Sequence, residues 1–200
     1  MYPAEQTSVR VSPSAVAVLA LFVLLSSPEI LAALLLAALA HEWGHYLALR
    51  AFGGRVDTIT VTALGAEMHI APQKSLSYGA EILATFAGPA VNLLLALFLG
   101  FAGQHMSICY LFSGAQFILG AFNLLPITPL DGGSILWLAV AWVTEPYTAD
   151  HAAADIGLVA SFILLAATAM VGCHVGGGGF LVATSLWLLL TSLRQRLRLT

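Results

Sequence analysis

Residues 34–52 read LLLAALAHEWGHYLALRAF, an apolar stretch with three ionisable side chains in its middle: His41, Glu42 and His45. A helix that crosses a bilayer needs about 20 mostly apolar residues. An ionisable residue inside such a helix costs about 2.5–3.5 kcal/mol on insertion scales, so it is a functional candidate by default. The stretch therefore predicts a membrane helix that carries a functional site.

The spacing of the three polar residues suits a metal ion. His41 and His45 are one helical turn apart and share a face, so they can bind one cation, while Glu42 lies about 100° around the helix and can reach a water beside that cation. This is the H-E-x-x-H arrangement. The structural alternative is a polar cluster that only holds helices together.

A third ligand is expected from another segment, and Asp131 is the best candidate. It lies in NLLPITPLDGG at residues 123–133, where Pro126 and Pro129 break the predicted helix and two glycines permit a turn. Irregular backbone at membrane depth occurs only where it is buried in protein or lines a wet cavity. Two histidines, one carboxylate and an open position make a tetrahedral catalytic zinc site. The alternative is a plain surface turn.

A further polar side chain, Asn92, lies in the apolar sequence FAGPAVNLLLALF. Pro89 is expected to kink this helix, and an amide inside lipid needs a hydrogen-bond partner. The pattern is compatible with helix packing alone.

The composition of the whole chain indicates that lipid is its solvent. The chain has 200 residues, of which 60% are hydrophobic and 8% are charged. Soluble domains carry about 25% charged residues. The net charge of −3 argues against a nucleic-acid partner. Cys109 and Cys173 form neither a disulfide framework nor a metal pattern, so they are interpreted as small buried hydrophobes.

Six segments are predicted to cross the membrane. They are residues 11–27, 28–52, 75–101, 106–125, 152–171 and 180–193. The predicted fold is an all-α polytopic membrane protein with about six transmembrane helices, organised as a single domain over residues 1–200. A signal peptide at the first segment is disfavoured, because only Arg10 precedes it and no small-residue cleavage site follows.

The basic residues predict the orientation in the cell membrane. With six crossings and a cytoplasmic N-terminus, all seven fall on the cytoplasmic side, as the positive-inside rule requires. They are Arg10, Arg50, Arg55, Lys74, Arg194, Arg196 and Arg198. Both termini are then cytoplasmic, and the last three arginines are expected to contact anionic lipid headgroups. His45 precedes Arg50 by about 7.5 Å of helix, which places the site within the bilayer toward the cytoplasm.

Residues 53–72 depart from the helical pattern. A β-branched run from Val56 to Thr62 and a second run from Ala66 to Ile70, separated by Gly65, predict two short strands. We expect a hairpin or small sheet at the cytoplasmic membrane surface between the second and third helices. An ordinary loop is the alternative.

Three motifs together resemble one known family. HEWGH at 41–45, GPAVN at 88–92 and NLLPITPLDGG at 123–133 resemble, in order and spacing, the signatures of the site-2 protease family of intramembrane zinc metalloproteases. The resemblance covers roughly residues 28–140. The six-helix layout without a PDZ insertion is most similar to the stage IV sporulation protein FB branch, although the CBS domain usual in that branch does not follow the last predicted helix.

The resemblance implies a zinc-dependent intramembrane metalloendopeptidase. It implies that Zn²⁺ is held by His41, His45 and Asp131, that Glu42 is the general base, and that Asn92 and Asn123 are polar groups near the substrate or its oxyanion. The implied substrate is a membrane-tethered protein, such as a pro-sigma or anti-sigma factor, cut in or near its transmembrane segment. A regulatory or inhibitory membrane partner is also implied, and an unwound substrate is expected to add to an open edge of the predicted strands.

Two other functions remain open from the residues alone. An ion or proton transporter could use the same intramembrane histidines and carboxylate as a relay, although the two halves of the chain show no matching pair of interrupted helices. A catalytically inactive membrane scaffold is the other alternative. The presence of Glu42 argues against it, because a structural metal site has no need of that acid.

Overall fold

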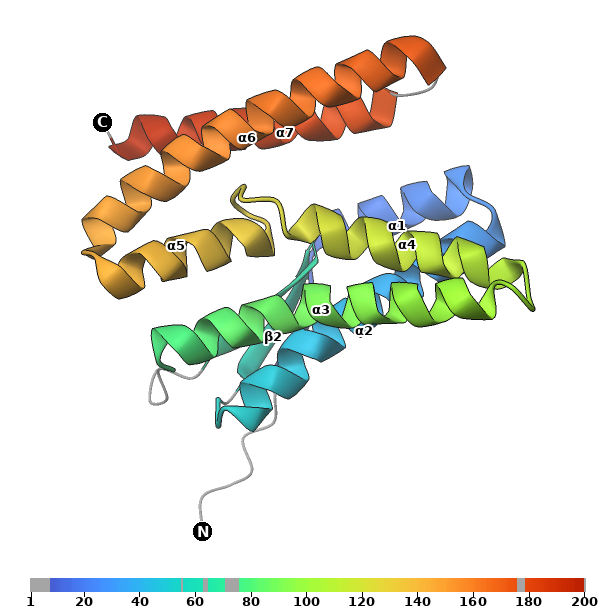
Figure 1. The fold of residues 1–200 in the computed structure, drawn as a ribbon, viewed down its shortest axis with the longest axis horizontal. Coiled ribbons are helices and arrows are strands. Elements are labelled where there is room, and N and C mark those ends of the chain that lie inside the picture. Colours follow the sequence, from blue (N-terminus) through green and yellow to red (C-terminus); the bar gives the residue numbers. More distant parts are fainter. Residues whose placement is uncertain (1–7, 55, 63–64, 71–75, 176–178, 200) are drawn as a thin grey trace. The chain divides into compact units, whose positions relative to one another are not determined.

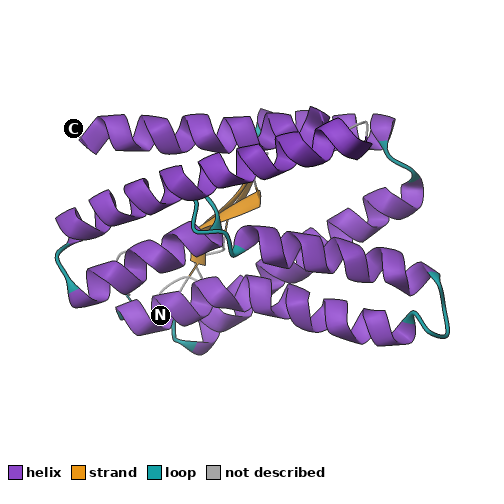
Figure 2. Cartoon of the chain, turned by 45° about the horizontal axis from the view of Figure 1, so that its top comes forward, coloured by secondary structure: helices purple, strands orange, loops and turns teal. Residues whose placement is uncertain are grey.

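The computed structural model describes residues 8–54, 56–62, 65–70, 76–175 and 179–199. These contain seven helices and a small sheet, so helix predominates, as Figure 2 shows. The contacts within the chain divide it into two compact units, residues 1–121 and 122–200, which are described separately below. Arg55 and Lys74, which enter the orientation argument, lie outside the described residues, as do residues 63–64 between the two predicted strands.

The first unit consists of a small sheet and four helices, and its sheet is formed by segments before the first helix and between the second and third helices (Figure 1). Its elements are β1 (Ser8–Val11), α1 (Pro13–Leu25), α2 (Pro28–Ala51), β2 (Val56–Thr62), β3 (Gly65–Ile70) and α3 (Tyr78–Ala102). Helix α4 (Ile108–Asn123) follows, with its last two residues counted in the second unit. The second unit continues with α5 (Asp131–Val143), α6 (Pro146–Val175) and α7 (Gly179–Leu199).

Serine caps fix where several of these helices begin. The side chains of Ser12, Ser27 and Ser77 each accept a hydrogen bond from the backbone N–H three residues further on, at α1, α2 and α3 respectively. Such a cap satisfies an N–H group that has no partner inside the helix. Proline follows the cap in α1 and α2, where its missing N–H costs nothing.

The helices expose apolar side chains, as those of a membrane protein do. Leu24, Phe98 and Ile118, for example, are largely exposed, which would be costly in water but is favourable in lipid. By length and composition three of the described helices can cross a bilayer: Pro28–Ala51, Tyr78–Ala102 and Pro146–Gly172. Helices α1, α4 and α5 are apolar but shorter, so the predicted count of six crossings stays a prediction.

Helices α2 and α3 pack closely because small residues line their contact. On α2 the buried positions include Ala33, Ala37, His41 and Gly44, which recur every three or four residues and so share one face. A Cβ on Gly44 would lie only 2.7 Å from the carbonyl oxygen of Ala87. Close backbone approach of this kind is how helices associate in lipid, where no hydrophobic drive favours their contact.

The sheet has the order β1-β2-β3, with β1 parallel and β3 antiparallel to β2. The strands from 56 to 70 occur where the sequence predicts them, whereas β1 is not predicted. Val56 at the start of β2 packs with Leu49 of α2 and Ala84 of α3, which ties the sheet to both helices. Its predicted place at the cytoplasmic membrane surface stays a prediction.

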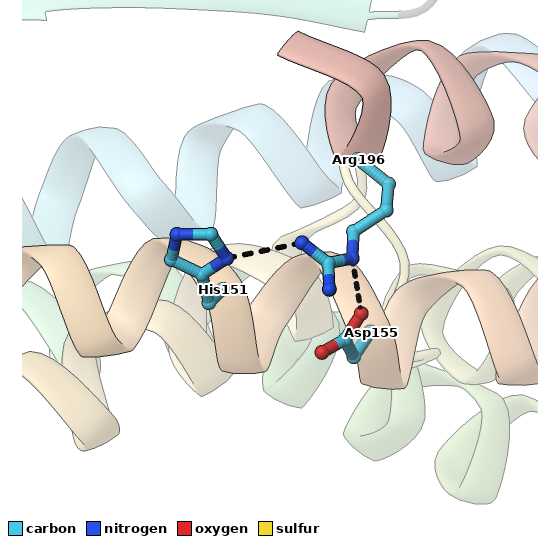
Figure 3. A network of polar contacts seen from close by, with 3 residues as sticks. All are labelled: His151, Asp155 and Arg196. Atoms are coloured by element: carbon cyan, nitrogen blue, oxygen red, sulfur yellow. Dashed lines mark hydrogen bonds and ion pairs between the residues drawn. The ribbon is translucent and has the colours of Figure 1, made fainter. Parts of the chain in front are cut away.

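In the second unit, α6 packs against both α5 and α7. Trp137 of α5 donates a hydrogen bond to Asp150 of α6 over 2.7 Å. On the other side of α6, Arg196 of α7 forms an ion pair with Asp155 at 2.6 Å and contacts Nδ1 of His151 at 3.0 Å (Figure 3). Arg196 is therefore paired with residues of α6 while still partly exposed, and its predicted contact with lipid headgroups stays a prediction.

The main difference from the sequence prediction is α5, which none of the six predicted segments includes. Gly132 and Gly133 were interpreted as a turn, but they form the first helical turn of α5. A Cβ on Gly132 would overlap the backbone of Leu124, and one on Gly133 would lie 2.6 Å from that of Ile127. Glycine is required there by close backbone approach. Helix α6 also starts at Pro146 rather than at residue 152, because proline suits a first turn.

Candidate metal centre

The two motif histidines lie on one face of α2, as their spacing predicts. Their rings are perpendicular, with centroids 4.7 Å apart, and the two Nε2 atoms are separated by 3.1 Å. His41 is buried at 6% exposure, while His45 is half-buried. The hydrogen bonds of the two Nδ1 atoms determine which nitrogen of each neutral ring carries the proton.

His45 is oriented by helix α3. Its Nδ1 lies 2.9 Å from the backbone carbonyl oxygen of Ala84, which can only accept a hydrogen bond, so Nδ1 carries the proton. The imidazole passes directly over Gly88, where a Cβ would overlap the ring. Gly88 of the GPAVN motif thus provides the space in which the His45 ring lies, and in the neutral ring Nε2 is the nitrogen that carries the lone pair.

His41 is oriented by Asn92, also on α3. Asn92 is fully buried, and its Nδ2 donates to the backbone carbonyl oxygen of Ala37 over 3.0 Å. This contact fixes the amide so that Oδ1 faces Nδ1 of His41 at 2.6 Å and accepts its proton. The partner that an amide in lipid requires is therefore present, and His41 also keeps a lone pair on Nε2.

In neutral imidazoles with the proton on Nδ1, the Nε2 lone pairs are the donor atoms that a zinc ion binds. Zinc binds imidazole nitrogen at about 2.0–2.1 Å with tetrahedral angles, which places two such nitrogens about 3.3 Å apart. The observed separation is close to this value. Nδ1 of each ring also makes a hydrogen bond, as it does in metal-binding histidines.

The remaining predicted site residues lie as follows. Glu42 follows His41 on α2 and is half-buried. Asn123 is the last residue of α4, and Asp131 is the first residue of α5, where the helix N-terminus favours a carboxylate. The segment between them contains a cis peptide bond at Thr128-Pro129. Asn123 and Asp131 belong to the second unit, and the histidines belong to the first.

Gln116 of α4 is a residue at this site that the sequence analysis missed. It is buried at 4% exposure and its Oε1 accepts a hydrogen bond from Asn92. Its only signal in the sequence is that of a lone amide in an apolar helix, the same signal that singled out Asn92. Gly44 was missed as well, since its role lies in helix approach rather than in chemistry.

Fold and site together define a class: a membrane protein in which packed helices hold a pair of histidines prepared for a metal ion. Comparison with known proteins agrees. The model of peptidase family M50 matches residues 29–114 and 101–167. The chain therefore belongs to peptidase family M50, the family of the site-2 proteases.

Several individual proteins are similar to the chain. A zinc metalloprotease of Mycobacterium tuberculosis named Rip3 is 34% identical over 165 residues, covering 72% of this chain and 40% of that protein. A zinc metalloprotease of Methanocaldococcus jannaschii is 27% identical over 139 residues, covering 66% and 40%. The chain thus spans about two fifths of the length of these relatives. The solved site-2 protease of M. jannaschii has the same fold, with a TM-score of 0.67 at 20% identity over 98% of this chain and 94% of that chain.

Proposed function

We propose that this protein is an intramembrane zinc metalloprotease that hydrolyses a peptide bond in or near the transmembrane segment of a membrane-tethered protein. One observation carries the proposal: His41 and His45, on a helix long enough to cross a bilayer, bring their Nε2 atoms to 3.1 Å from each other. Glu42 lies between them in the sequence. The 3.1 Å separation is close to the one that two nitrogens bound to the same zinc ion have.

The third ligand in this proposal is Asp131. Two imidazoles and one carboxylate would leave one position open in a tetrahedral site. Bound zinc would supply Lewis acidity, which polarises the scissile carbonyl and makes water easier to deprotonate.

The other residues handle protons and substrate. Glu42 takes the proton from the attacking water and passes it to the leaving amine. Asn123 supports the developing oxyanion. The Asn92 amide holds His41 by a hydrogen bond. That Asn92 also lies near the substrate stays a prediction.

Substrate and location complete the proposal. The enzyme is a multi-pass protein of the cell membrane with both termini in the cytoplasm, and it acts in regulated intramembrane proteolysis of a factor such as a pro-sigma or anti-sigma factor. An extended substrate adds as a strand to the sheet. Because β2 is flanked on both sides, the outer edge of β1 or β3 receives it. A membrane partner regulates the cleavage.

The test combines metal content with cleavage. The purified protein should contain one zinc per chain, and cells that also express tagged single-span membrane proteins should accumulate a cleaved fragment. Glu42→Gln should bind zinc but cleave about 10²–10⁴-fold more slowly. Glu29→Gln is the matched control, since it makes the same change in the exposed first turn of the same helix. A wild type without zinc, or a Glu42→Gln variant that cleaves normally, would refute the proposal.

A further inference from the structure

A buried polar chain links three helices of the first unit behind the histidine pair. It runs from Gln116 on α4 to Asn92 on α3 and on to His41 on α2. Asn92 and Gln116 are 0% and 4% exposed, so neither amide reaches solvent. Buried amides in an apolar helix are costly unless every donor has a partner, so the arrangement of their donors is informative.

The directions of these hydrogen bonds follow from one fixed acceptor. The backbone oxygen of Ala37 can only accept, so the Asn92 atom 3.0 Å away is the amide nitrogen. The second N–H of that nitrogen points to Gln116, which must present its oxygen. Both donors of Asn92 are then used, and its oxygen is left to accept the Nδ1 proton of His41.

The amide of Asn92 is held against rotation by two acceptors rather than one. Rotation by 180° would place its oxygen against the oxygens of Ala37 and Gln116 and its nitrogen against His41. His41 would then have to carry its proton on Nε2, the nitrogen that faces His45, and could not bind a metal there. The orientation of Asn92 therefore decides which nitrogen of His41 is available.

We propose that Gln116 is a positioning residue for the metal centre: by accepting the second N–H of Asn92, it fixes the amide orientation that holds the His41 proton on Nδ1 and leaves Nε2 as a ligand. The inference rests on the metal site of the proposed function and deepens it. Gln116 does not touch the metal or the substrate. It acts through Asn92, two hydrogen bonds away from the ligand atom.

The main test replaces Gln116 by methionine, which keeps the length of the side chain but removes the acceptor. Zinc affinity, measured by competition with a chromophoric chelator in detergent, should fall about tenfold, at the low end of what outer-shell substitutions cost. Gln116→Glu keeps an acceptor oxygen and should restore most of the affinity. In the metal-free protein, ¹⁵N NMR should show a single Nδ1–H tautomer of His41 in the wild type and a mixture in Gln116→Met.

The matched control is Ser113→Ala. Ser113 lies one turn before Gln116 on α4 and donates to the carbonyl oxygen of Ala96 on α3 over 2.7 Å. Its removal also deletes a hydrogen bond between α3 and α4, but it leaves Asn92 untouched. Zinc affinity and the His41 tautomer should both stay as in the wild type.

A double substitution separates a relay from general packing. In an Asn92→Ala background, Gln116→Met should cause no further loss of zinc affinity, because the hydrogen bond through which Gln116 acts on His41 is already gone. The inference is overturned if Gln116→Met keeps the wild-type affinity, if Ser113→Ala loses as much, or if the two losses add. If the wild type itself binds no zinc, the proposed function fails instead.

Discussion

The close approach of α2 and α3 leads to a sharp prediction about Gly44. Alanine at this position would place a Cβ 2.7 Å from the carbonyl oxygen of Ala87, whereas ordinary contact begins at about 3.4 Å. The helices must therefore separate locally by about 0.7 Å. The hydrogen bonds that hold the rings of His41 and His45 would lengthen from 2.6 and 2.9 Å to about 3.3 and 3.6 Å. Both then exceed the range of good hydrogen bonds.

Gly44→Ala should thus weaken zinc binding without removing a ligand. Loss of outer-shell hydrogen bonds to metal-binding histidines costs about 10–100-fold in metal affinity. Overpacking costs about 1–3 kcal/mol of stability, offset by about 1 kcal/mol from replacing a helical glycine by alanine. The net loss of stability should reach at most about 2 kcal/mol, so the variant should still fold.

The assay compares Gly44→Ala with Gly114→Ala. Gly114 lies within α4, and a Cβ there would have no neighbour within 4 Å, so this control gains helix propensity without a clash. Zinc affinity is measured by chelator competition, and stability by thermal unfolding of the metal-free proteins. If Gly44→Ala binds zinc as tightly as Gly114→Ala, close helix approach does not position the histidines and the reasoning is wrong.

Three further substitutions test a proposed metal ligand, a close glycine contact and an ion pair. Asp131→Asn should lower zinc affinity by more than an outer-shell change does, with little effect on the melting temperature of the metal-free protein, and an unchanged affinity would remove Asp131 from the ligand set. Gly133→Ala should destabilise the protein by about 1–3 kcal/mol in thermal unfolding, because its Cβ would meet the backbone of Ile127; a neutral result would contradict that contact. Asp155→Asn should cost less than about 1 kcal/mol in the same assay, since the ion pair with Arg196 is part-exposed, at 56% and 31%. A larger loss would show that this pair is a main link between α6 and α7.

Secondary structure was predicted correctly where a sequence pattern has a single physical interpretation. The helix around His41 and His45 follows from an apolar run with i, i+4 histidines, and the strands from Val56 follow from β-branched residues next to a glycine. In each case the local residues alone determine the outcome. The requirement that Asn92 find a partner could also be predicted, because lipid offers none.

Features that depend on distant contacts were not predicted. A pair of glycines such as Gly132 and Gly133 is also typical of a turn. Here the two glycines begin a helix, and they are needed because the backbone near Ile127 approaches them closely. The partner of Asn92 could not be identified either, since Gln116 is 24 residues away and a lone amide in an apolar helix does not reveal which residue it contacts. Strand β1 is equally unmarked, because its pairing with β2 spans 50 residues.

The residues that pack α2 against α3 are also those that prepare the metal site. In lipid, helices associate through close contact and hydrogen bonds, and here the same bonds that join the helices, from His41 to Asn92 and from His45 to Ala84, set the histidine tautomers. Assembly of the helix pair and preparation of the ligands are therefore one event. It follows that zinc should stabilise the packed pair by mass action, and that substitutions which loosen the pair should reduce zinc affinity even when they lie far from the ligands.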